Sequence, residues 1–341
     1  MADVLCLGEI LVDWVSTTAG AELDQAATFT KAAGGAPANT AVGLARQGVK
    51  TGFIGRVSDD EFGRWLKSVL EKDGIDTSLT ISDAEAQTRM AYVVTTKTGD
   101  RKLAEFTKVA CADVRLHEKD LDPKHFASAK VLHFGSISLI GSPAKEATEK
   151  AVKLARENNM VVSYDPNVRL GLWPSAQACK DAILSTLKWA DIVKINEDEL
   201  EFLTGSRETE KADALRKAHD LPVLIITLDS RGAYVTNKEG GKVVPGFQVK
   251  LVEATGAGDG FNSGVITGLL PLITNDDLLK KASGKRRQLI ESIELNNLCQ
   301  IIARANAIGA ITCTRAGAIP ALPTTEEINS FLAEMTANTP A

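Results

Sequence analysis

The chain has 341 residues and a mass of 36.3 kDa, which suits one large domain or two small ones. Hydrophobic residues make up 44% and charged residues 24%, the balance of an ordinary globular protein, and no apolar segment is long enough to span a membrane. The net charge of -5 argues against a general surface for nucleic acid or for an anionic membrane.

Five cysteines are spread along the chain with no Cys-x-x-Cys pair: Cys6, Cys111, Cys179, Cys299 and Cys313. An odd number without metal-ligand spacing favours free thiols in a reducing compartment. The first residues also lack the pattern of a secretory signal peptide. We therefore expect a cytoplasmic protein.

In chain order, the first apolar run covers residues 4–15 and predicts one buried strand. Its polar residues are expected at or beyond its C-terminal end, the edge where ligands bind in open α/β sheets. Asp13, between two apolar residues, is unusual in such company. We interpret it as a ligand-facing carboxylate, with a turn residue as the alternative.

A glycine pair, Gly34 and Gly35, precedes a proline and a helix of small residues expected over 40–47. Glycines let a backbone approach a ligand closely, and the amide of Asn39 can both donate to and accept from hydroxyl groups. By itself this pattern also fits the start of an ordinary helix.

The next segments predict a strand over 51–57 and a helix from 59 to about 72. The acids in the first turn of that helix are interpreted as partners of the helix dipole rather than as a metal site. Residues 86–107 alternate in character around a Thr-Gly-Asp turn at 98–100, which is typical of a hairpin. Together with residues 16–30 this hairpin predicts a small sheet separate from the main one.

From about residue 117 strands and helices alternate, which predicts a mostly parallel sheet. The expected strands, ending in a hairpin, cover residues 130–134, 161–164, 192–195, 223–228 and 233–244. The expected helices cover residues 142–159, 175–190, 197–203, 261–270 and 301–313. Residues 271–297 are polar and helical and contain no motif, so surface helices are expected there.

Polar clusters follow several of these strands: Asp13; Asn167 and Arg169; Asn196 and Glu199; residues 229–232; and residues 253–259. Each alone fits an ordinary loop. Because parallel strands end at one edge of a sheet, their convergence predicts a ligand site there.

A glycine-rich loop at 255–261 (TGAGDGF) leads into the helix expected over 261–270. Gly256 and Gly258 allow a sharp turn whose amide N–H groups would form a nest for an anion. An acid in such a nest, Asp259, suits a base that takes a proton from an alcohol while the amides hold a transferring phosphoryl group. A helix N-cap is the alternative.

The loop 255–259, together with Gly34, Gly35 and Asn39, resembles the two signatures of the PfkB/ribokinase family of carbohydrate kinases. Within that family, the segments 133–143, 164–175, 196–205 and 314–324 look like those of fructokinases. The resemblance implies an α/β, ribokinase-like fold, with a Rossmann-like, mostly parallel sheet flanked by helices. It implies a single kinase domain over 1–341 with a small β-sheet lid formed by about 16–30 and 86–110.

The implied reaction transfers the γ-phosphoryl group of ATP to the primary hydroxyl of fructose, giving fructose 6-phosphate and ADP. Asp259 would be the base, and the amides of Gly256, Ala257 and Gly258 the anion hole. The residues implied to bind the sugar are Asp13, Gly34, Gly35, Asn39, Asn167, Arg169 and Lys108. Those implied to bind the nucleotide are Lys194, Asn196, Glu199, Thr227, Ser230, Gly232, Thr255 and Asn306.

The resemblance also implies Mg²⁺, organised through water by Asn196 and Glu199. A supporting K⁺ is expected near Glu253 and Gly317. Since exposed sheet edges tend to be paired, a homodimer through the lid strands is a further expectation.

Two departures from the family pattern concern the ligands. Glu253 stands where the second signature normally begins with Asp, and residues 108–113 read KVACAD where fructokinases have Arg-Asn-Pro-Ser-Ala-Asp. Arg and Lys are not interchangeable at a site that holds hydroxyl groups. The alternatives are therefore a PfkB kinase for ribose or 2-keto-3-deoxygluconate, or a non-catalytic fructokinase-like binding protein.

Overall fold

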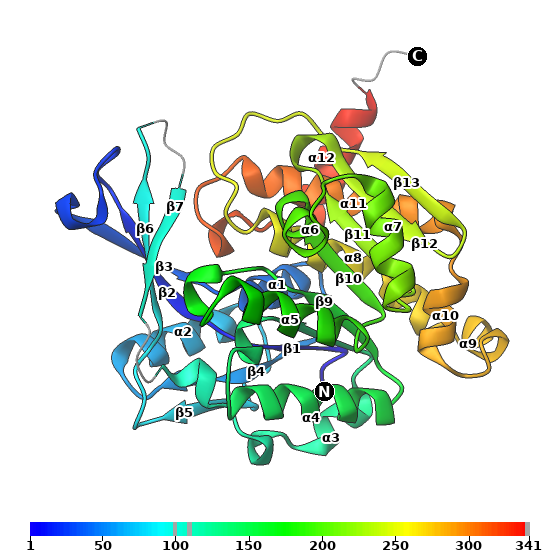
Figure 1. Cartoon of the computed structure of the whole chain (residues 1–341), viewed down its shortest axis with the longest axis horizontal. Helices are drawn as coiled ribbons and strands as arrows, with labels where there is room; N and C mark the ends of the chain where they lie inside the picture. The colour runs from blue at the N-terminus through cyan, green and yellow to red at the C-terminus, as the bar shows by residue number, and fades with distance from the viewer. Residues whose placement is uncertain (98–100, 108–110, 338–341) are drawn as a thin grey trace.

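The computed structural model describes residues 1–97, 101–107 and 111–337. A nine-stranded sheet carries helices on both faces, and a four-stranded sheet stands to one side of it (Figure 1). The expected α/β class and the small separate sheet are both present. The turn predicted at 98–100 and Lys108 lie outside the described residues.

The main sheet is parallel except for the two strands at one edge, β12 and β13, which pair antiparallel. In spatial order its strands are β13 (Gly240–Pro245), β12 (Gly232–Asn237), β11 (Val223–Thr227), β10 (Ile192–Asn196), β9 (Val161–Asp165), β8 (Val131–Gly135), β1 (Val4–Leu7), β4 (Thr51–Ser58) and β5 (Thr80–Asp83). The predicted alternation of strands and helices after residue 117 is confirmed.

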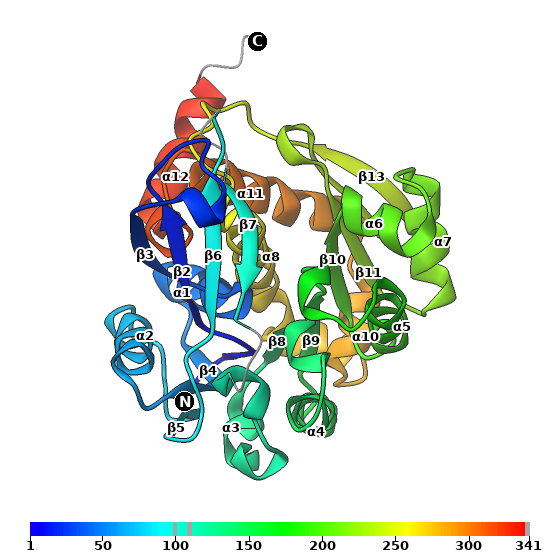
Figure 2. The ribbon, with the colours of Figure 1, turned by 60° about the vertical axis from the view of Figure 1, so that its left-hand side comes forward.

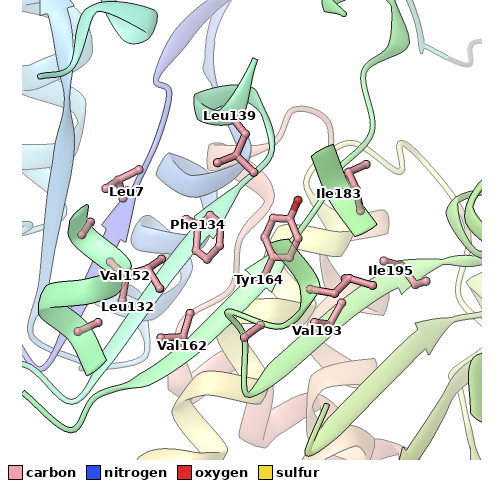
Figure 3. Close-up of a cluster of buried hydrophobic side chains, with 14 of the residues drawn as sticks. Leu7, Leu132, Phe134, Leu139, Val152, Val162, Tyr164, Ile183, Val193 and Ile195 are labelled. Atoms are coloured by element: carbon pink, nitrogen blue, oxygen red, sulfur yellow. The ribbon is translucent and has the colours of Figure 1, made fainter. Parts of the chain in front are cut away.

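One face of this sheet packs against the helices of the middle of the chain. Those helices are α3 (Pro123–Ser128), α4 (Ala144–Glu157), α5 (Ala176–Leu187), α6 (Glu197–Thr204) and α7 (Thr209–Ala218). Strand side chains alternate between faces, so Leu5 and Leu7 lie on this side. Phe134 and Tyr164 stack at its centre with ring centroids 4.6 Å apart (Figure 3).

The other face packs against helices from both ends of the chain. They are α1 (Ala36–Arg46), α2 (Glu61–Lys72), α8 (Ala257–Ile273), α10 (Arg286–Ser292) and α11 (Leu295–Cys313). Small residues let α8 and α11 approach closely: a side chain at Gly264 would lie 2.9 Å from the Cα atom of Ala305. The last helix, α12 (Thr325–Ala337), packs on α11.

The small sheet contains β3 (Phe29–Gly34), β2 (Leu11–Ser16), β6 (Met90–Thr95) and β7 (Arg101–Phe106), in that order. β2 pairs antiparallel with β3 and parallel with β6, and β6 and β7 form an antiparallel pair. Figure 2 shows this sheet rising from the side of the main sheet near α1 and α8.

The prediction of one strand over 4–15 is wrong. β1 ends at Leu7, and the chain turns at Gly8, whose φ of 150° is in a region that side chains rarely adopt. A Cβ atom there would also lie 2.6 Å from Pro37 Cγ. Asp13 is therefore in the middle of β2 in the small sheet, not at the end of a main-sheet strand.

The polar segment 271–297 does form surface helices, and an arginine fastens it to the sheet. It contains α9 (Asp276–Lys281) and α10. From α10, Arg287 binds Asp191, which precedes β10, with 2.8 Å between Nη1 and Oδ1. Among the described helices, none combines the length and the apolar character needed to cross a membrane.

Candidate active site

A cavity of about 930 Å³ lies between the small sheet and the carboxyl ends of main-sheet strands. Asp165, Asn196 and Thr227 line it, and each is the last residue of its strand. The small sheet contributes Leu11, Asp13, Ala91, Val93, Leu103 and Phe106. The predicted convergence of polar residues on this sheet edge is thus present.

The glycine-rich loop forms the N-terminus of α8 at this cavity. Gly256 is the N-cap residue with a φ of 82°, and a Cβ atom there would lie 2.9 Å from the Cα atom of Ala318. At Gly258 a Cβ atom would lie 2.9 Å from Lys194 Nζ. The N-terminus of α8 and a lysine ammonium group therefore lie close together, which favours an anion, although the amide of Ala257 already donates to the carbonyl oxygen of Ala254 at 3.1 Å.

Asp259 lies in the first turn of α8, beyond the N-cap position. The alternative of an N-cap residue is therefore excluded for it. Its Oδ2 accepts a hydrogen bond of 2.8 Å from Asn39 Nδ2. Burial, with a contribution from Asp165, raises the pKa of Asp259 to about 6, against the opposing effects of Asn39 and Lys194. A carboxylate with such a pKa suits a base at neutral pH.

Asn39 lies in the first turn of α1 and is 4% exposed. While its Nδ2 contacts Asp259, its Oδ1 is buried with no hydrogen-bond partner in the described part of the chain. A buried acceptor without a partner is costly, so a ligand hydroxyl group would be a favourable donor for it.

Lys194 belongs to a buried polar group behind the loop. Its Nζ lies 3.1 Å from Asp165 Oδ2, which also accepts a 2.7 Å hydrogen bond from Asn262 Nδ2. Burial opposes the charge of Lys194, but the nearby carboxylates of Asp165 and Glu199 raise its pKa above the usual value. It therefore remains a cation at this edge of the sheet.

Asp165 and Asn262 are functional candidates that the sequence motifs alone did not single out. Asp165 directly precedes a Pro-Asn pair at 166–167, and Asn262 follows Asp259 by three residues, which places both on one face of α8. That spacing is the signal that could have found Asn262.

Asn196 and Glu199 form a capping box at the start of α6. Asn196 Oδ1 accepts from the Glu199 amide, and Glu199 Oε2 accepts from the Asn196 amide at 2.9 Å. Glu199 Oε1 accepts a 2.7 Å bond from the amide of Val168. Both oxygens of Glu199 thus accept from backbone amides, and the bond of Oε1 to Val168 holds the loop that carries Asn167 and Arg169.

The far end of the cavity is lined from β11, the loop after β13, and α11. Asn306 Nδ2 donates to the carbonyl oxygens of Val244 and Pro245, at 3.1 and 3.0 Å, and so holds the end of β13, where that loop begins. Glu253 is 7% exposed and accepts a 2.7 Å bond from the amide of Gly317, which brings together the two residues expected near a cation.

Most of the predicted site residues line this one cavity. They are Asp13, Gly35, Asn39, Asn167, Arg169, Lys194, Asn196, Thr227, Ser230, Gly232, Glu253, Thr255, Gly256, Ala257, Gly258, Asp259 and Asn306. Glu199 and Gly317 lie behind its wall, and so does Gly34, where a side chain would collide with the Asp13 carboxylate. Lining residues not predicted include Glu9, Leu103, Phe106 and Asp165.

The acids near the cavity do not by themselves form a metal site. In residues 1–97, 101–107 and 111–337 no group of three or more His, Cys, Asp or Glu side chains could hold a metal ion.

Comparison with known proteins identifies the family of the chain. Residues 1–325 match the pfkB family of carbohydrate kinases. The chain is 39% identical over 330 residues to fructokinase-2 of Solanum lycopersicum, a match that covers 96% of this chain and 95% of the relative.

Solved structures of similar fold include two bacterial fructokinases. The fructokinase of Xylella fastidiosa with bound ATP has a TM-score of 0.85 and 26% identity, over 98% of this chain and 100% of that one. A double mutant of the Vibrio cholerae O395 enzyme with fructose, ADP and potassium ion has a TM-score of 0.79 and 28% identity, over 97% and 98%. The chain belongs to the pfkB family of carbohydrate kinases, which are phosphotransferases.

Proposed function

We propose that this carbohydrate kinase is an ATP-dependent fructokinase, which forms fructose 6-phosphate and ADP. The observation that carries the proposal is the position of Asp259. Its buried carboxylate lies in the first turn of α8, beside Asn39 and near Lys194, in a cavity large enough for a sugar and a nucleotide. The names of the relatives support fructose as the acceptor.

In the proposed reaction, the oxygen of the primary hydroxyl group of the sugar attacks the γ-phosphorus of ATP, and ADP leaves. Asp259 accepts the proton of that hydroxyl group. The amides of Gly256, Ala257 and Gly258 and the ammonium group of Lys194 hold the negative charge of the transferring phosphoryl group. This chemistry needs positioning and charge stabilisation and no covalent nucleophile.

The sugar would bind at the end of the cavity between Asp259 and the small sheet, which would act as a lid. Asp13, Gly35, Asn39, Asn167 and Arg169 line this part and offer donors and acceptors to its hydroxyl groups. Gly34 would act indirectly, by leaving room for the carboxylate of Asp13. Lys108 remains a predicted sugar ligand.

The nucleotide would occupy the far end of the cavity. The proposed ligands there are Lys194, Asn196, Thr227, Ser230, Gly232, Thr255 and Asn306. Mg²⁺ fits as an ion that enters with the phosphates, because it keeps several waters and uses few protein ligands. When bound, it would neutralise charge on the β- and γ-phosphates. Glu199 would help indirectly, through Asn196.

A monovalent cation, K⁺, would be held near Glu253 and Gly317, whose hydrogen bond closes the loop before α8.

We further propose that the chain is a single kinase domain and that its lid sheets pair in a homodimer. β3 and β7 are the edges of that sheet, and a monomeric mass in light scattering would contradict the dimer. The cytoplasmic location remains a prediction.

A kinase for another sugar, ribose or 2-keto-3-deoxygluconate, is the second candidate. It rests on the KVACAD segment at 108–113, which departs from the fructokinase pattern and follows β7 closely in the sequence. ADP release with ATP, Mg²⁺ and K⁺ should be compared across fructose, glucose, ribose and 2-keto-3-deoxygluconate. Turnover of a different sugar would replace fructose and keep the kinase.

The role of Asp259 is tested by Asp259→Asn. The variant keeps an acceptor for Asn39 and removes the base, so kcat with fructose should fall about 10³-fold while ATP binding in calorimetry stays near that of the wild type. Substantial residual turnover would contradict the assignment. If the wild type binds ATP and phosphorylates none of the four sugars, the non-catalytic alternative takes its place.

A further inference from the structure

The chain passes four times between the main part of the molecule and the small sheet, and each connecting segment is called a crossing here. The first crossing, between β1 and β2, contains Glu9, and the second, between β3 and α1, is Gly35. The third enters β6 through Arg89. The fourth leaves β7 and is described at Thr107 and again from Cys111.

The first two crossings are packed backbone against backbone. Gly35 has a φ of 109°, and a Cβ atom there would lie 2.5 Å from the carbonyl oxygen of Glu9. As the N-cap residue of α1, Gly35 has no side chain to accept a bond from the first amides of the helix. Glu9 supplies the missing acceptor, because its Oε1 accepts from the amide of Ala36 at 3.0 Å.

The third and fourth crossings are joined by a buried ion pair. Arg89 Nε lies 2.6 Å from Asp113 Oδ2, and the two side chains are 5% and 2% exposed. Arg89 Nη1 also donates to the carbonyl oxygen of Thr107 at 2.9 Å. The carbonyl oxygen of Arg89 accepts from the amide of Val12 in β2, which ties these crossings to the first.

Glu9 also belongs to the wall of the candidate active site. It is 3% exposed and lines the cavity. Burial raises its pKa to about 7, and the carboxylates of Asp113 and Asp259 add to the rise. Arg89 is in turn influenced by the charge of Glu9. One carboxyl group thus holds the start of α1 and lines the cavity that also contains Asp259.

We propose that Glu9 is a positioning residue for the sugar site. It belongs to the first crossing and holds the amide of Ala36 just after the second, so it fixes the start of α1 relative to the small sheet. Asn39 lies three residues after Ala36 in the same turn, so the start of α1 sets its position and, through the 2.8 Å bond, that of Asp259. This inference rests on the proposed sugar kinase activity.

The test compares Glu9→Ala with Glu9→Gln. Alanine removes the acceptor for the Ala36 amide, and the start of α1 loses a contribution typical of a helix cap. If the sugar site must regain that order on binding, the KM for fructose should rise about tenfold. The KM for ATP should stay within about twofold, as for a change remote from the nucleotide end. Glutamine keeps an acceptor oxygen, and we expect it to restore most of the affinity for fructose.

A cap of similar strength far from the site supplies the control. Asn275 caps α9 by accepting from the amides of Asp277 and Leu278 at 3.0 Å, and α9 lies on the opposite side of the molecule from the small sheet (Figure 1). Asn275→Ala should lower thermal stability as Glu9→Ala does and leave both KM values unchanged. If Glu9→Ala changes stability alone, Glu9 is only a structural cap and the inference is wrong.

A readout without turnover separates this result from a failure of the proposed function. Hydrogen exchange at the start of α1 and in β2 should be faster in Glu9→Ala than in the wild type and in Glu9→Gln. Unchanged exchange in these segments would overturn the positioning role of Glu9 whether or not fructose is the substrate. Lack of fructose turnover in the wild type would instead overturn the proposed function.

Discussion

At the scale of single residues, the proposed base is defined by what surrounds it. Burial and the neighbouring Asp165 disfavour the charge of Asp259, while Asn39 favours it through a hydrogen bond. The local sequence does show an acid in a glycine-rich loop. The asparagine that orients it stands 220 residues away in the chain, so no local pattern could join the two.

The pKa of Asp259 leads to a prediction about pH. Because that pKa is raised to about 6, the carboxyl group is protonated and inactive below this pH, and kcat/KM for the sugar should fall about tenfold per unit of pH there. The measurement is a pH profile of kcat/KM with saturating ATP.

A matched variant checks which group is titrating in this profile. Asn39→Ala removes a hydrogen bond that stabilises the ionised form, so the midpoint of the profile should move to higher pH. A wild-type profile that stays flat down to pH about 4, the range of an unperturbed Asp, would contradict the role of Asp259 as base.

At the scale of elements, the amino edge of the main sheet is held by one buried acid. Asp191 is fully buried and directly precedes β10 in the sequence. It contacts Arg156 of α4 at 2.6 Å and Arg287 of α10 at 2.8 Å, and it accepts from the amide of Val162. Since α4 and α10 cover opposite faces of the sheet, Asp191 connects the two layers.

Removing this acid should affect stability and not catalysis. Asp191→Ala removes one carboxylate that binds two arginines and a buried amide. The arginines keep other partners, among them the carbonyl oxygens of Trp189 and Ala190, and the free energy of unfolding should fall by ~3 kcal/mol in urea denaturation. KM and kcat should not change, because the cavity is at the other end of the strands. Lys280→Ala, which breaks an exposed pair with Asp277, is the control and should have almost no effect. A stable Asp191→Ala protein with impaired kinetics would contradict this role.

At the scale of the whole molecule, the two sheets form opposite walls of the cavity. Residues that are far apart in the sequence come together in each wall. β2 pairs with β6, with Val12 opposite Met90, and the resulting small sheet faces residues of β9, β10 and α8 across the cavity. A ligand at the sugar end would therefore contact both sheets, and a ligand at the nucleotide end only the main one.

This arrangement predicts a division in hydrogen exchange. Fructose alone should slow exchange in β2 and β6, whereas a nucleotide alone should slow it in residues 246–259 and leave the small sheet unchanged. Peptides from α9, remote from the cavity, should respond to neither. Protection of the small sheet by ATP as strong as that by fructose would contradict the proposed placement of the two substrates.

The sequence alone determined the regular second half of the fold, the glycine-rich loop, the acid within it and the family, because periodicity and turn residues are local properties. It could not show that the chain leaves the main sheet at Gly8, since residues before and after this turn are equally apolar. Only the tertiary structure decided that Asp13 belongs to the small sheet, that Asn39 holds Asp259, and that Glu9 caps α1. The physical reason is that these contacts depend on how distant strands and helices pack, and packing of that kind leaves no periodic trace in the chain.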